Sequence, residues 1–329
     1  MGRLKIGFIG AGGIAGLHAD RLKNVEDAEI AAFADIVRGK AEEKAAKYGG
    51  RAYTDWREML SREELDVVYI CTPPYARGSE TIEAAEKGIH VFVEKPIALS
   101  LDLAVEIAEA VERTGVKSQV GYVWRHTSGI NKARRLVKAG ELGRIGLFAA
   151  KYLGDMLWVA RTEHWWKDIR KSGGHVVEQV THTYDSLRYI MGEVEEVCAY
   201  SNRFASLEDE SWSVEDAHVA ILKLRGGAIA CVYSTACAPA WLQGWCIVGE
   251  KGLVELPDPF TVELRIRGEE PKKMEARGDP YLAESLELFR AIKEDSKTRA
   301  PIREGVETLK LTLAVRRSFE SSGEKVRLD

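Results

Sequence analysis

The sequence predicts an α/β fold of two domains, and three observations lead to this prediction. The chain has 329 residues, which is long for one domain and comfortable for two. Over residues 1–122, short apolar segments alternate with segments of helical periodicity. A glycine-rich turn, GAGGIA, directly follows the first apolar segment. Such alternation with apolar strands is typical of a parallel sheet that is covered by helices on both faces.

The elements of the first domain follow from this alternation. Strands are expected at 4–10, 28–35, 65–71, 89–94 and 117–122. Helices are expected at 13–24, 38–49, 79–88 and 101–115. Ser100 should cap the last helix, because a serine side chain can accept a hydrogen bond from the first helical turn. Gly115 stands where that helix should end.

The first turn matches the pattern G-x-G-x-x-A from Gly10 to Ala15. Gly10 allows the tight turn, and Gly12 lets the backbone approach a pyrophosphate. The helix that starts here directs its unpaired N–H groups and the positive end of its dipole at the phosphates. We therefore expect Gly10, Gly12, Gly13 and Ile14 to bind a dinucleotide.

A carboxylate ends the second predicted strand. Asp35 stands where it can accept hydrogen bonds from the adenosine ribose and repel a 2′-phosphate. This position favours NAD as the cofactor. NADP stays an alternative, because Arg38 follows three residues later and softens the preference.

The segment VFVEKPIALS places a lysine where a buried strand leaves the core. Glu94, Lys95 and Pro96 follow the apolar residues of this strand. In a doubly wound sheet, ligands bind beyond the carboxyl ends of the strands. Pro96 favours an extended conformation for Lys95 and so fixes its direction. The lysine suits a hydrogen bond to a substrate hydroxyl or to the nicotinamide; a solvated lysine at the end of a strand is the alternative.

The second half is rich in strands, with little helical signal before residue 281. Strands are expected at 144–153, 196–202, 215–224 and 252–257. The stretch from Gly226 to Gly249 has no charged residue and reads as two strands buried in a sheet or at a subunit contact, rather than as a membrane span.

Composition excludes some partners. The net charge of −4 does not suit nucleic acid or an anionic membrane, since both favour basic surfaces. The five cysteines form no C-x-x-C pair, and we interpret them as reduced thiols of a cytoplasmic protein.

With GAGGIAGLH, CTPPYARGSETIEAAEKGIHVFVEKP and KAGELGRIG, the chain resembles the glucose–fructose oxidoreductase/inositol dehydrogenase (Gfo/Idh/MocA) family. The resemblance implies a Rossmann NAD(P)-binding domain at 1–122. It also implies a substrate-binding and oligomerisation domain at 123–329, built on a large, mostly antiparallel open sheet. Its closing helix, at about 304–322, is expected to pack back between the domains. The implied activity is NAD(P)-dependent oxidation of a hydroxyl of a sugar, cyclitol or related polyol, in a homodimer or homotetramer.

The resemblance also assigns roles to individual residues. Lys95 corresponds to the lysine of the family's Glu-Lys-Pro motif, which lies near nicotinamide and substrate. Arg125 matches a family arginine that contacts the substrate or the nicotinamide. Thr72, Pro73 and Glu94 are expected in the wall of the cofactor crevice. Arg77 stands where many members carry histidine; it suits a substrate carboxylate or a cofactor phosphate.

The segment EQVTHTYD carries the sharpest local pattern. Glu178, His182 and Asp185 are spaced i, i+4, i+7, so one helix would place all three on one face. Histidine exchanges protons near neutral pH, which suits removal of a hydroxyl proton. We expect His182 to be the base, Glu178 to orient it or relay the proton, and Asp185 to bind substrate. The family pattern is Asp-x-Gly-x-His, so Glu178 and Val180 depart from it.

Alternatives remain open for these residues. Glu178 and His182 are spaced like metal ligands, with His164 or His175 as a third, but no H-E-x-x-H motif or cysteine cluster supports a metal. His18 is interpreted as packed or solvated. The aromatic residues interpreted as sugar-binding faces or as core packing are Trp158, Trp165 and Trp166.

Two other functions fit the same residues. A redox-neutral enzyme of this family would hold NAD tightly through a transient oxidation. A dinucleotide-sensing regulator would need the fold but no proton relay, so Lys95 and His182 argue against it.

Overall fold

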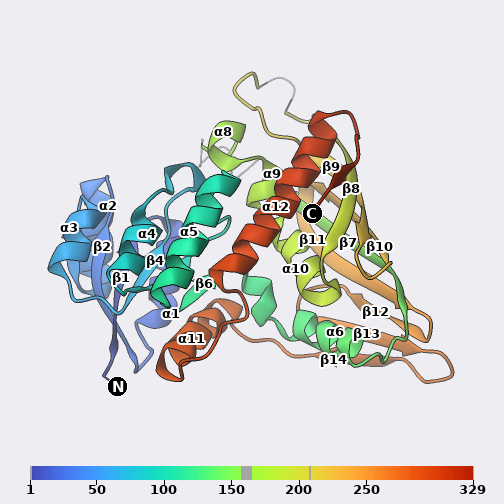
Figure 1. Cartoon of the computed structure of the whole chain (residues 1–329), viewed down its shortest axis with the longest axis horizontal. Coiled ribbons are helices and arrows are strands. Elements are labelled where there is room, and N and C mark those ends of the chain that lie inside the picture. Colours follow the sequence, from blue (N-terminus) through green and yellow to red (C-terminus); the bar gives the residue numbers. More distant parts are fainter. Residues whose placement is uncertain (1, 157–164, 207–208, 329) are drawn as a thin grey trace. The chain divides into compact units, whose positions relative to one another are not determined.

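The computed structural model of the protein describes residues 2–156, 165–206 and 209–328 (Figure 1). The chain divides into two compact units. The N-terminal unit consists of Met1–Tyr122 and Asp279–Val306, and the C-terminal unit of Val123–Gly278 and Glu307–Asp329. Each unit has its own hydrophobic core.

The N-terminal unit contains a six-stranded sheet in the order β3-β2-β1-β4-β5-β6. Every pairing in this sheet is parallel. The strand order reverses between β1 and β4, which is the position where doubly wound sheets bind their ligands. The strands are β1 (Leu4–Ile9), β2 (Ala28–Ala34), β3 (Arg51–Tyr53), β4 (Val67–Ile70), β5 (His90–Val93) and β6 (Ser118–Val120).

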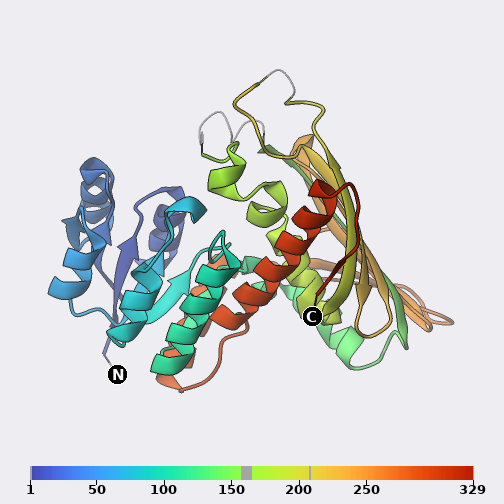
Figure 2. The same ribbon diagram turned by 45° about the horizontal axis from the view of Figure 1, so that its top comes forward.

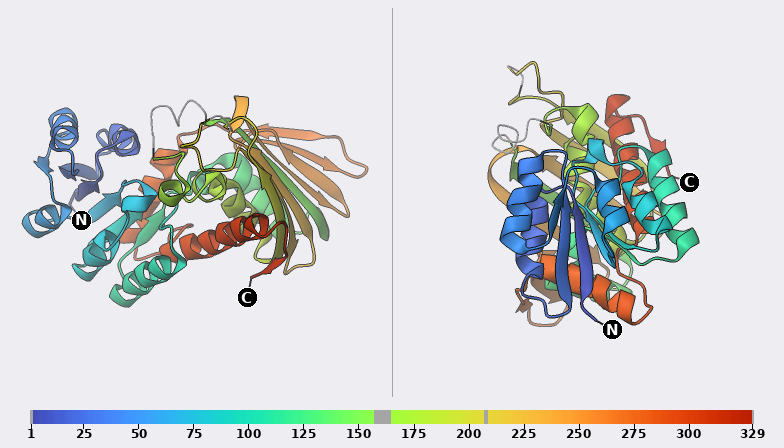
Figure 3. Two further views of the ribbon diagram at one scale, coloured as in Figure 1. Left: turned by 90° about the horizontal axis from the view of Figure 1, so that it is seen from above. Right: turned by 90° about the vertical axis from the view of Figure 1, so that its left-hand side faces the viewer.

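Helices cover both faces of this sheet (Figure 3, right). On one face α1 contacts α2 and α11, and on the other α4 contacts α3 and α5. The strands are therefore buried on both sides, which explains their unbroken apolar sequences. The helices of this unit are α1 (Gly13–Leu22), α2 (Arg38–Tyr48), α3 (Trp56–Arg62), α4 (Glu80–Glu86), α5 (Leu101–Thr114) and α11 (Pro280–Lys293), with the 3₁₀ turn η1 (Pro74–Ala76).

The strands and helices expected for the first 122 residues are confirmed, with two additions. The sequence analysis missed β3 and α3, because a three-residue strand and a seven-residue helix are too short to show a period. The caps of α5 are also confirmed. The Ser100 side chain accepts a hydrogen bond from the N–H group of Leu103, and Gly115 is left-handed, with φ of 73°.

The C-terminal unit contains a nine-stranded sheet in the order β14-β13-β12-β11-β7-β10-β9-β8-β15. Among the described strands, β7 and β10 form the one parallel pair, so the sheet is mostly antiparallel. The strands are β7 (Ile145–Asp155), β8 (Val194–Asn202), β9 (Ala217–Leu224), β10 (Ile229–Thr235), β11 (Cys237–Gly249), β12 (Gly252–Leu256), β13 (Thr261–Ile266), β14 (Lys272–Glu275) and β15 (Val326–Arg327).

Helices lie against one face of this sheet, as the view from above shows (Figure 3, left). Residues of α6, α10 and α12 share a core with the inward side chains of the strands. The opposite face carries no described helix (Figure 2), and Val219 and Ile221 on it are 50% and 60% exposed. The helices are α6 (Ser128–Lys138), α8 (Ile169–Ser172), α9 (His175–Glu178), α10 (Thr181–Met191) and α12 (Ile302–Glu320), with the 3₁₀ turn η2 (Val123–His126).

The uncharged stretch from Gly226 to Gly249 forms β10 and β11, as expected. No helix in the described part of the chain is both long and apolar enough to cross a membrane. The expectation of little helix before residue 281 was wrong for α6. Its apolar side chains Ile130, Ala133 and Leu136 are buried at helical spacing, but polar residues outnumber them in the sequence.

Candidate functional site

The glycine turn after β1 has the geometry that a dinucleotide requires. Gly10 has a φ of 89°, and a Cβ atom there would lie 2.8 Å from the backbone of Cys71 and Thr72. At Gly12 and Gly13, by contrast, no atom of the described residues lies within 4 Å of where a Cβ would stand, apart from chain neighbours and the helix's own backbone. Helix α1 begins at Gly13, so this open space lies at a helix N-terminus, where phosphates bind favourably. Ile14 is partly buried and packs against the core of the unit.

Asp35 is held beside this turn. Its carboxylate accepts hydrogen bonds from the N–H groups of Ala11, at 2.9 Å, and Val37, at 2.8 Å. Arg38 points into solvent, where its side chain is 71% exposed and pairs with Glu42 at 3.6 Å. The fixed carboxylate therefore lies beside the turn, where it can discriminate a ribose hydroxyl from a 2′-phosphate.

The end of β4 provides a further test of whether a dinucleotide fits. The Thr72 hydroxyl oxygen is buried and has no hydrogen-bond partner among the described residues. Buried polar atoms are nearly always bonded, so this oxygen is one that a ligand would satisfy. Pro73 follows it, half-buried, at the N-terminus of η1. With the open space above Gly12, these residues fit a dinucleotide.

Lys95 is the second residue after β5 and is half-buried. The carboxylate of Glu94 accepts a hydrogen bond from the Lys95 N–H group at 3.1 Å. Arg77 donates to the carbonyl oxygens of Glu94 and Lys95 from a buried position, and also to the carbonyl of Thr72 at 3.0 Å. Arg77 therefore joins the ends of β4 and β5 through its contacts with the backbone. Its interpretation as a binder of carboxylate or phosphate has no support in these contacts.

The segment from Glu178 to Asp185 is not the single helix that was expected. Glu178 ends α9, and α10 begins at Thr181 after a two-residue turn. Val180, which stands in place of the glycine of the family pattern, caps the start of α10. The reason is local: the N–H groups of both Gln179 and Val180 donate to the carbonyl of His175, which closes one helix before the next begins.

His182 lies near the start of α10 among aromatic rings. Its ring centroid is 5.2 Å from that of Trp124, which in turn lies 4.9 Å from Trp245 and 6.0 Å from Tyr152. The Tyr152 hydroxyl donates to the Gln179 side chain at 3.0 Å. Both His182 and Trp124 are half-buried, so a ligand can reach them. The sequence analysis did not find Trp124 or Tyr152; Trp124 precedes Arg125 directly, and this was the one available signal.

Glu178 is buried beside the tryptophans of the preceding loop. Its carboxylate accepts a hydrogen bond from the indole N–H group of Trp166 at 2.9 Å, and Trp166 is 1% exposed. Trp166 therefore orients Glu178 from the core, whereas Trp165 is half-buried. Trp158 and His164, which the sequence analysis also named, lie outside the described residues.

Arg125 and Asp185 form a buried ion pair. The Arg125 guanidinium donates to both carboxylate oxygens of Asp185, at 2.7 and 2.8 Å, and both residues are at most 2% exposed. The Thr308 hydroxyl donates to the same carboxylate at 3.1 Å. The pair joins η2, which carries Trp124, to α10, which carries His182. Its contacts support a positioning role; direct binding of cofactor by Arg125 and of substrate by Asp185 stay predictions.

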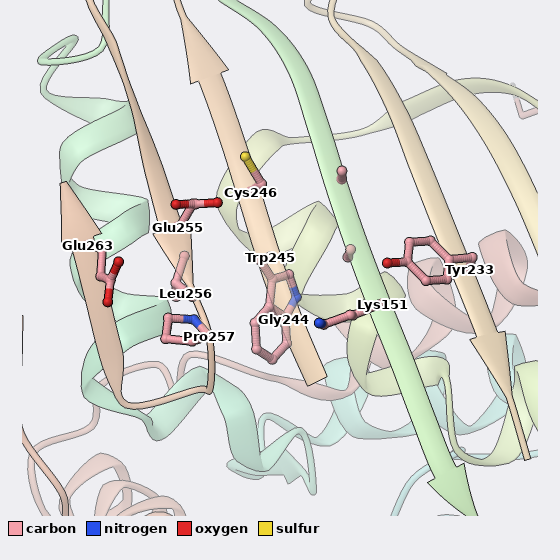
Figure 4. Close-up of a pocket in the computed structure, with 11 residues that line it drawn as sticks. Lys151, Tyr233, Gly244, Trp245, Cys246, Glu255, Leu256, Pro257 and Glu263 are labelled. Atoms are coloured by element: carbon pink, nitrogen blue, oxygen red, sulfur yellow. The ribbon is translucent and has the colours of Figure 1, made fainter. Parts of the chain in front are cut away.

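A separate hollow of about 380 Å³ lies on the face of the large sheet that carries no described helix (Figure 4). Residues of β7, β10, β11, β12 and β13 line it, among them Ala150, Trp245 and Leu256 of the core, and neither His182 nor Glu178 is among them. The labelled side chains with polar groups are Lys151, Tyr233, Cys246, Glu255 and Glu263.

Comparisons with known proteins agree with this geometry. A myo-inositol 2-dehydrogenase of Thermotoga maritima is 26% identical over 96% of each chain. A 2,7-anhydro-N-acetylneuraminate hydratase of Mediterraneibacter gnavus is 30% identical over 59% of this chain and 51% of its own. The solved structure of levoglucosan dehydrogenase in complex with NADH and levoglucosan superposes with a TM-score of 0.91 at 21% identity, over 99% of each chain.

Family models cover most of the sequence. Residues 4–122 match the oxidoreductase family model with an NAD-binding Rossmann fold, and residues 130–255 match the GFO/IDH/MocA C-terminal domain. The N-terminal unit, with its glycine turn and Asp35, is thus an NAD-binding Rossmann domain. The chain belongs to the Gfo/Idh/MocA family of oxidoreductases.

Proposed function

We propose that the protein transfers a hydride between a secondary hydroxyl carbon of a sugar, cyclitol or related polyol and NAD. The observation that carries this proposal is a lysine fixed at the carboxyl end of β5 in an NAD-binding domain. The similarity to myo-inositol 2-dehydrogenase over nearly the whole chain supports the substrate class.

The residues have separate roles in this proposal. Bound NAD⁺ supplies the hydride acceptor. Lys95 donates a hydrogen bond to the oxygen of the substrate and stabilises the negative charge that develops on it. His182 accepts the hydroxyl proton, and Glu178, oriented by Trp166, relays that proton or orients the imidazole.

The aromatic rings beside His182 suit the carbon skeleton of a polyol. Trp124 is half-buried and lies against the imidazole, so it presents a flat apolar surface next to the proposed base. Sugar and cyclitol rings have apolar C–H faces and polar edges, and such faces pack on aromatic rings. Trp165 is the second half-buried tryptophan that we propose for substrate binding.

A panel of inositols, aldoses and uronates tests the proposal. Each compound is added to the enzyme with NAD⁺ or with NADP⁺, and the absorbance of the reduced nicotinamide is followed. We expect at least one polyol to be oxidised, with NAD⁺ used more efficiently than NADP⁺ because of Asp35. Absence of turnover with every compound in both directions would remove the substrate class.

Redox-neutral chemistry is the second candidate function, and the similarity to a hydratase is the observation that favours it. In this case NAD would remain bound through purification, and substrate would be consumed without a net change in nicotinamide absorbance. Mass spectrometry of the products together with the absorbance record separates the two functions.

We also propose that a second copy of the chain covers the exposed face of the large sheet, in a cytoplasmic homodimer or homotetramer. Five hydrophobic side chains of β7, β9 and β10 are 37–60% exposed, and Tyr233 among them also lines the hollow of Figure 4. Contiguous exposed apolar patches often mark sites of protein–protein contact. These side chains are Leu147, Val219, Ile221, Ile229 and Tyr233.

Light scattering after size-exclusion chromatography tests this assembly. We expect Ile221→Glu to shift the protein to a smaller species. Lys138→Glu, at an exposed position of α6 on the face of the sheet that the helices cover, serves as the charged control. A monomeric wild type would contradict the proposal.

A further inference from the structure

We propose that His18 is a positioning residue for Lys95 and that it acts through Glu94. This inference rests on the proposed function, in which Lys95 contacts the substrate oxygen. It concerns a histidine on α1 that the mechanism above does not use.

The first observation is a continuous chain of contacts from α1 to Lys95. The Nε2 atom of His18 lies 2.9 Å from one carboxylate oxygen of Glu94. The other oxygen of the same carboxylate accepts the hydrogen bond from the Lys95 N–H group at 3.1 Å. Because each oxygen has its own partner, the plane of the carboxylate is fixed, and so is the direction of the peptide that leads into Lys95.

The second observation is burial. His18 is 0% exposed and Glu94 is 6% exposed. Breaking a buried hydrogen bond to a charged group leaves that charge unsatisfied, which is far more costly than losing a bond at the surface. The geometry at the end of β5 therefore depends on His18 and not on solvent.

The third observation is that the imidazole has little freedom. Its ring centroid lies 4.8 Å from Phe92, 5.4 Å from Tyr69 and 6.0 Å from Tyr281. These rings come from β5, β4 and α11, so three elements hold His18 in place. The Nδ1 atom has no hydrogen-bond partner among the described residues, which leaves Nε2 as the nitrogen that donates to Glu94.

The charges around Glu94 agree with this arrangement. Burial alone would raise the pKa of Glu94, but the hydrogen bond and charge of His18, together with the charges of Lys95 and Arg77, outweigh burial, and the pKa lies below its usual value. Glu284 on α11 is fully buried, and burial, with the nearby charge of Glu94, raises its pKa well above the usual value. The surroundings thus favour the neutral form of Glu284 and the ionised form of Glu94.

The backbone of β6 leaves room for the carboxylate. A Cβ atom at Gly121 would lie 2.9 Å from the Glu94 oxygen that faces Lys95. Any side chain there would displace the carboxylate, so the glycine belongs to the same arrangement. With Arg77 on the carbonyl oxygens of Glu94 and Lys95, the peptide that carries the lysine is held on several sides.

The experiment compares two substitutions of His18 with a control histidine on β5, the strand that leads to Glu94 and Lys95. His18→Leu removes the donor, whereas His18→Gln keeps an N–H group at similar reach. His90→Leu is the control: His90 begins β5, at the opposite end from Lys95, and its Nδ1 accepts the Lys117 N–H group at 2.9 Å.

We expect His18→Leu to lower kcat about tenfold to a hundredfold with NAD⁺ and the polyol of the panel that wild type oxidises fastest. The KM for NAD⁺ should change less than threefold. His18→Gln should recover most of the loss, and His90→Leu should keep wild-type kcat. Equal losses in both His18 variants, or no loss in His18→Leu, would overturn the inference.

A second variant separates this inference from the proposed function. If His18 acts through Lys95, adding His18→Leu to Lys95→Ala should lower kcat no further, since the two effects share one group. Full turnover of Lys95→Ala would refute the proposed function instead. Loss in Lys95→Ala with normal turnover in His18→Leu would refute only the role of His18.

A spectroscopic measurement does not depend on turnover. After reductive ¹³C-methylation of the lysines, the Lys95 signal is assigned by its absence in Lys95→Ala. We expect this signal to shift in His18→Leu and to return toward the wild-type position in His18→Gln. An unchanged Lys95 signal in His18→Leu would contradict a positioning role.

Discussion

The two proposed catalytic side chains are held in different ways. Lys95 is fixed through its backbone by polar groups, namely the carboxylate of Glu94 and the guanidinium of Arg77. The ring of His182 lies 5.2 Å from that of Trp124. The Arg125–Asp185 ion pair joins η2, which carries Trp124, to α10, which carries His182. The groups that contact the backbone of Lys95 directly lie within 18 residues of it in the sequence, whereas the ion pair on the side of His182 joins residues 60 positions apart.

This difference has energetic consequences. Charged groups that fix a backbone lose their effect when one partner is removed, because the remaining partner is then buried without compensation. Aromatic packing is less directional, so a small displacement there changes the contact energy gradually. We therefore expect the end of β5 to tolerate fewer substitutions than the aromatic cluster around His182.

The largest expected effect comes from removing either side chain. Lys95→Ala and His182→Ala should each lower kcat by roughly 10²–10⁴-fold, the usual contribution of a positioned acid or base. Affinity for NADH, measured by fluorescence titration, should change little. Lys151→Ala is the control, because Lys151 lines the hollow on the exposed sheet face. Wild-type turnover in both variants would remove the proposed mechanism.

The next effect tests the ion pair on the histidine side. Asp185→Ala should lower the free energy of unfolding by about 3–5 kcal/mol, because it leaves Arg125 charged and buried. Glu195→Ala removes one partner of an exposed pair with Lys223 in the same unit and should cost about 1 kcal/mol or less. Urea unfolding followed by tryptophan fluorescence measures both. Equal costs would show that the pair does not hold η2 on α10.

The smallest effect concerns a buried acid beneath α9, the short helix that ends in Glu178. Glu215 is fully buried and accepts a hydrogen bond from the Val176 N–H group at 2.7 Å. Burial raises the pKa of Glu215 to about 7. The folded state thus binds a proton that the unfolded state has already released, and stability present below about pH 4.5 is lost as the pH rises through 7.

Glu215→Gln should remove this dependence. The wild type should lose up to about 3 kcal/mol between pH 4.5 and 8 from this group, and the variant should not. The melting temperature of each protein at pH 5 and pH 8 provides the comparison. If the melting temperatures of wild type and variant differ by the same amount at pH 5 and at pH 8, folding does not raise the pKa of Glu215.

Much of the N-terminal site was predictable because its signals are contiguous. The turn from Gly10 to Ala15 follows β1 directly, Asp35 follows β2 directly, and Lys95 is the second residue after β5. In a parallel sheet the carboxyl ends of strands meet at one edge, so knowing the strands places these residues together. The C-terminal site was less predictable, because Trp124 and Tyr152 reach His182 from other elements.

The sequence by itself determined the alternation of strands and helices, the dinucleotide turn and the identity of the titratable groups. Those properties are local, since periodicity and turn chemistry are read within a few residues. Tertiary structure alone decided that His18 bonds Glu94 and that Arg125 bonds Asp185, partners 76 and 60 residues apart. A hydrophobic pattern specifies which face of an element is buried, but it does not specify which polar group of a neighbouring element that face will contact. That choice is made only when the elements pack and each buried charge must find a partner.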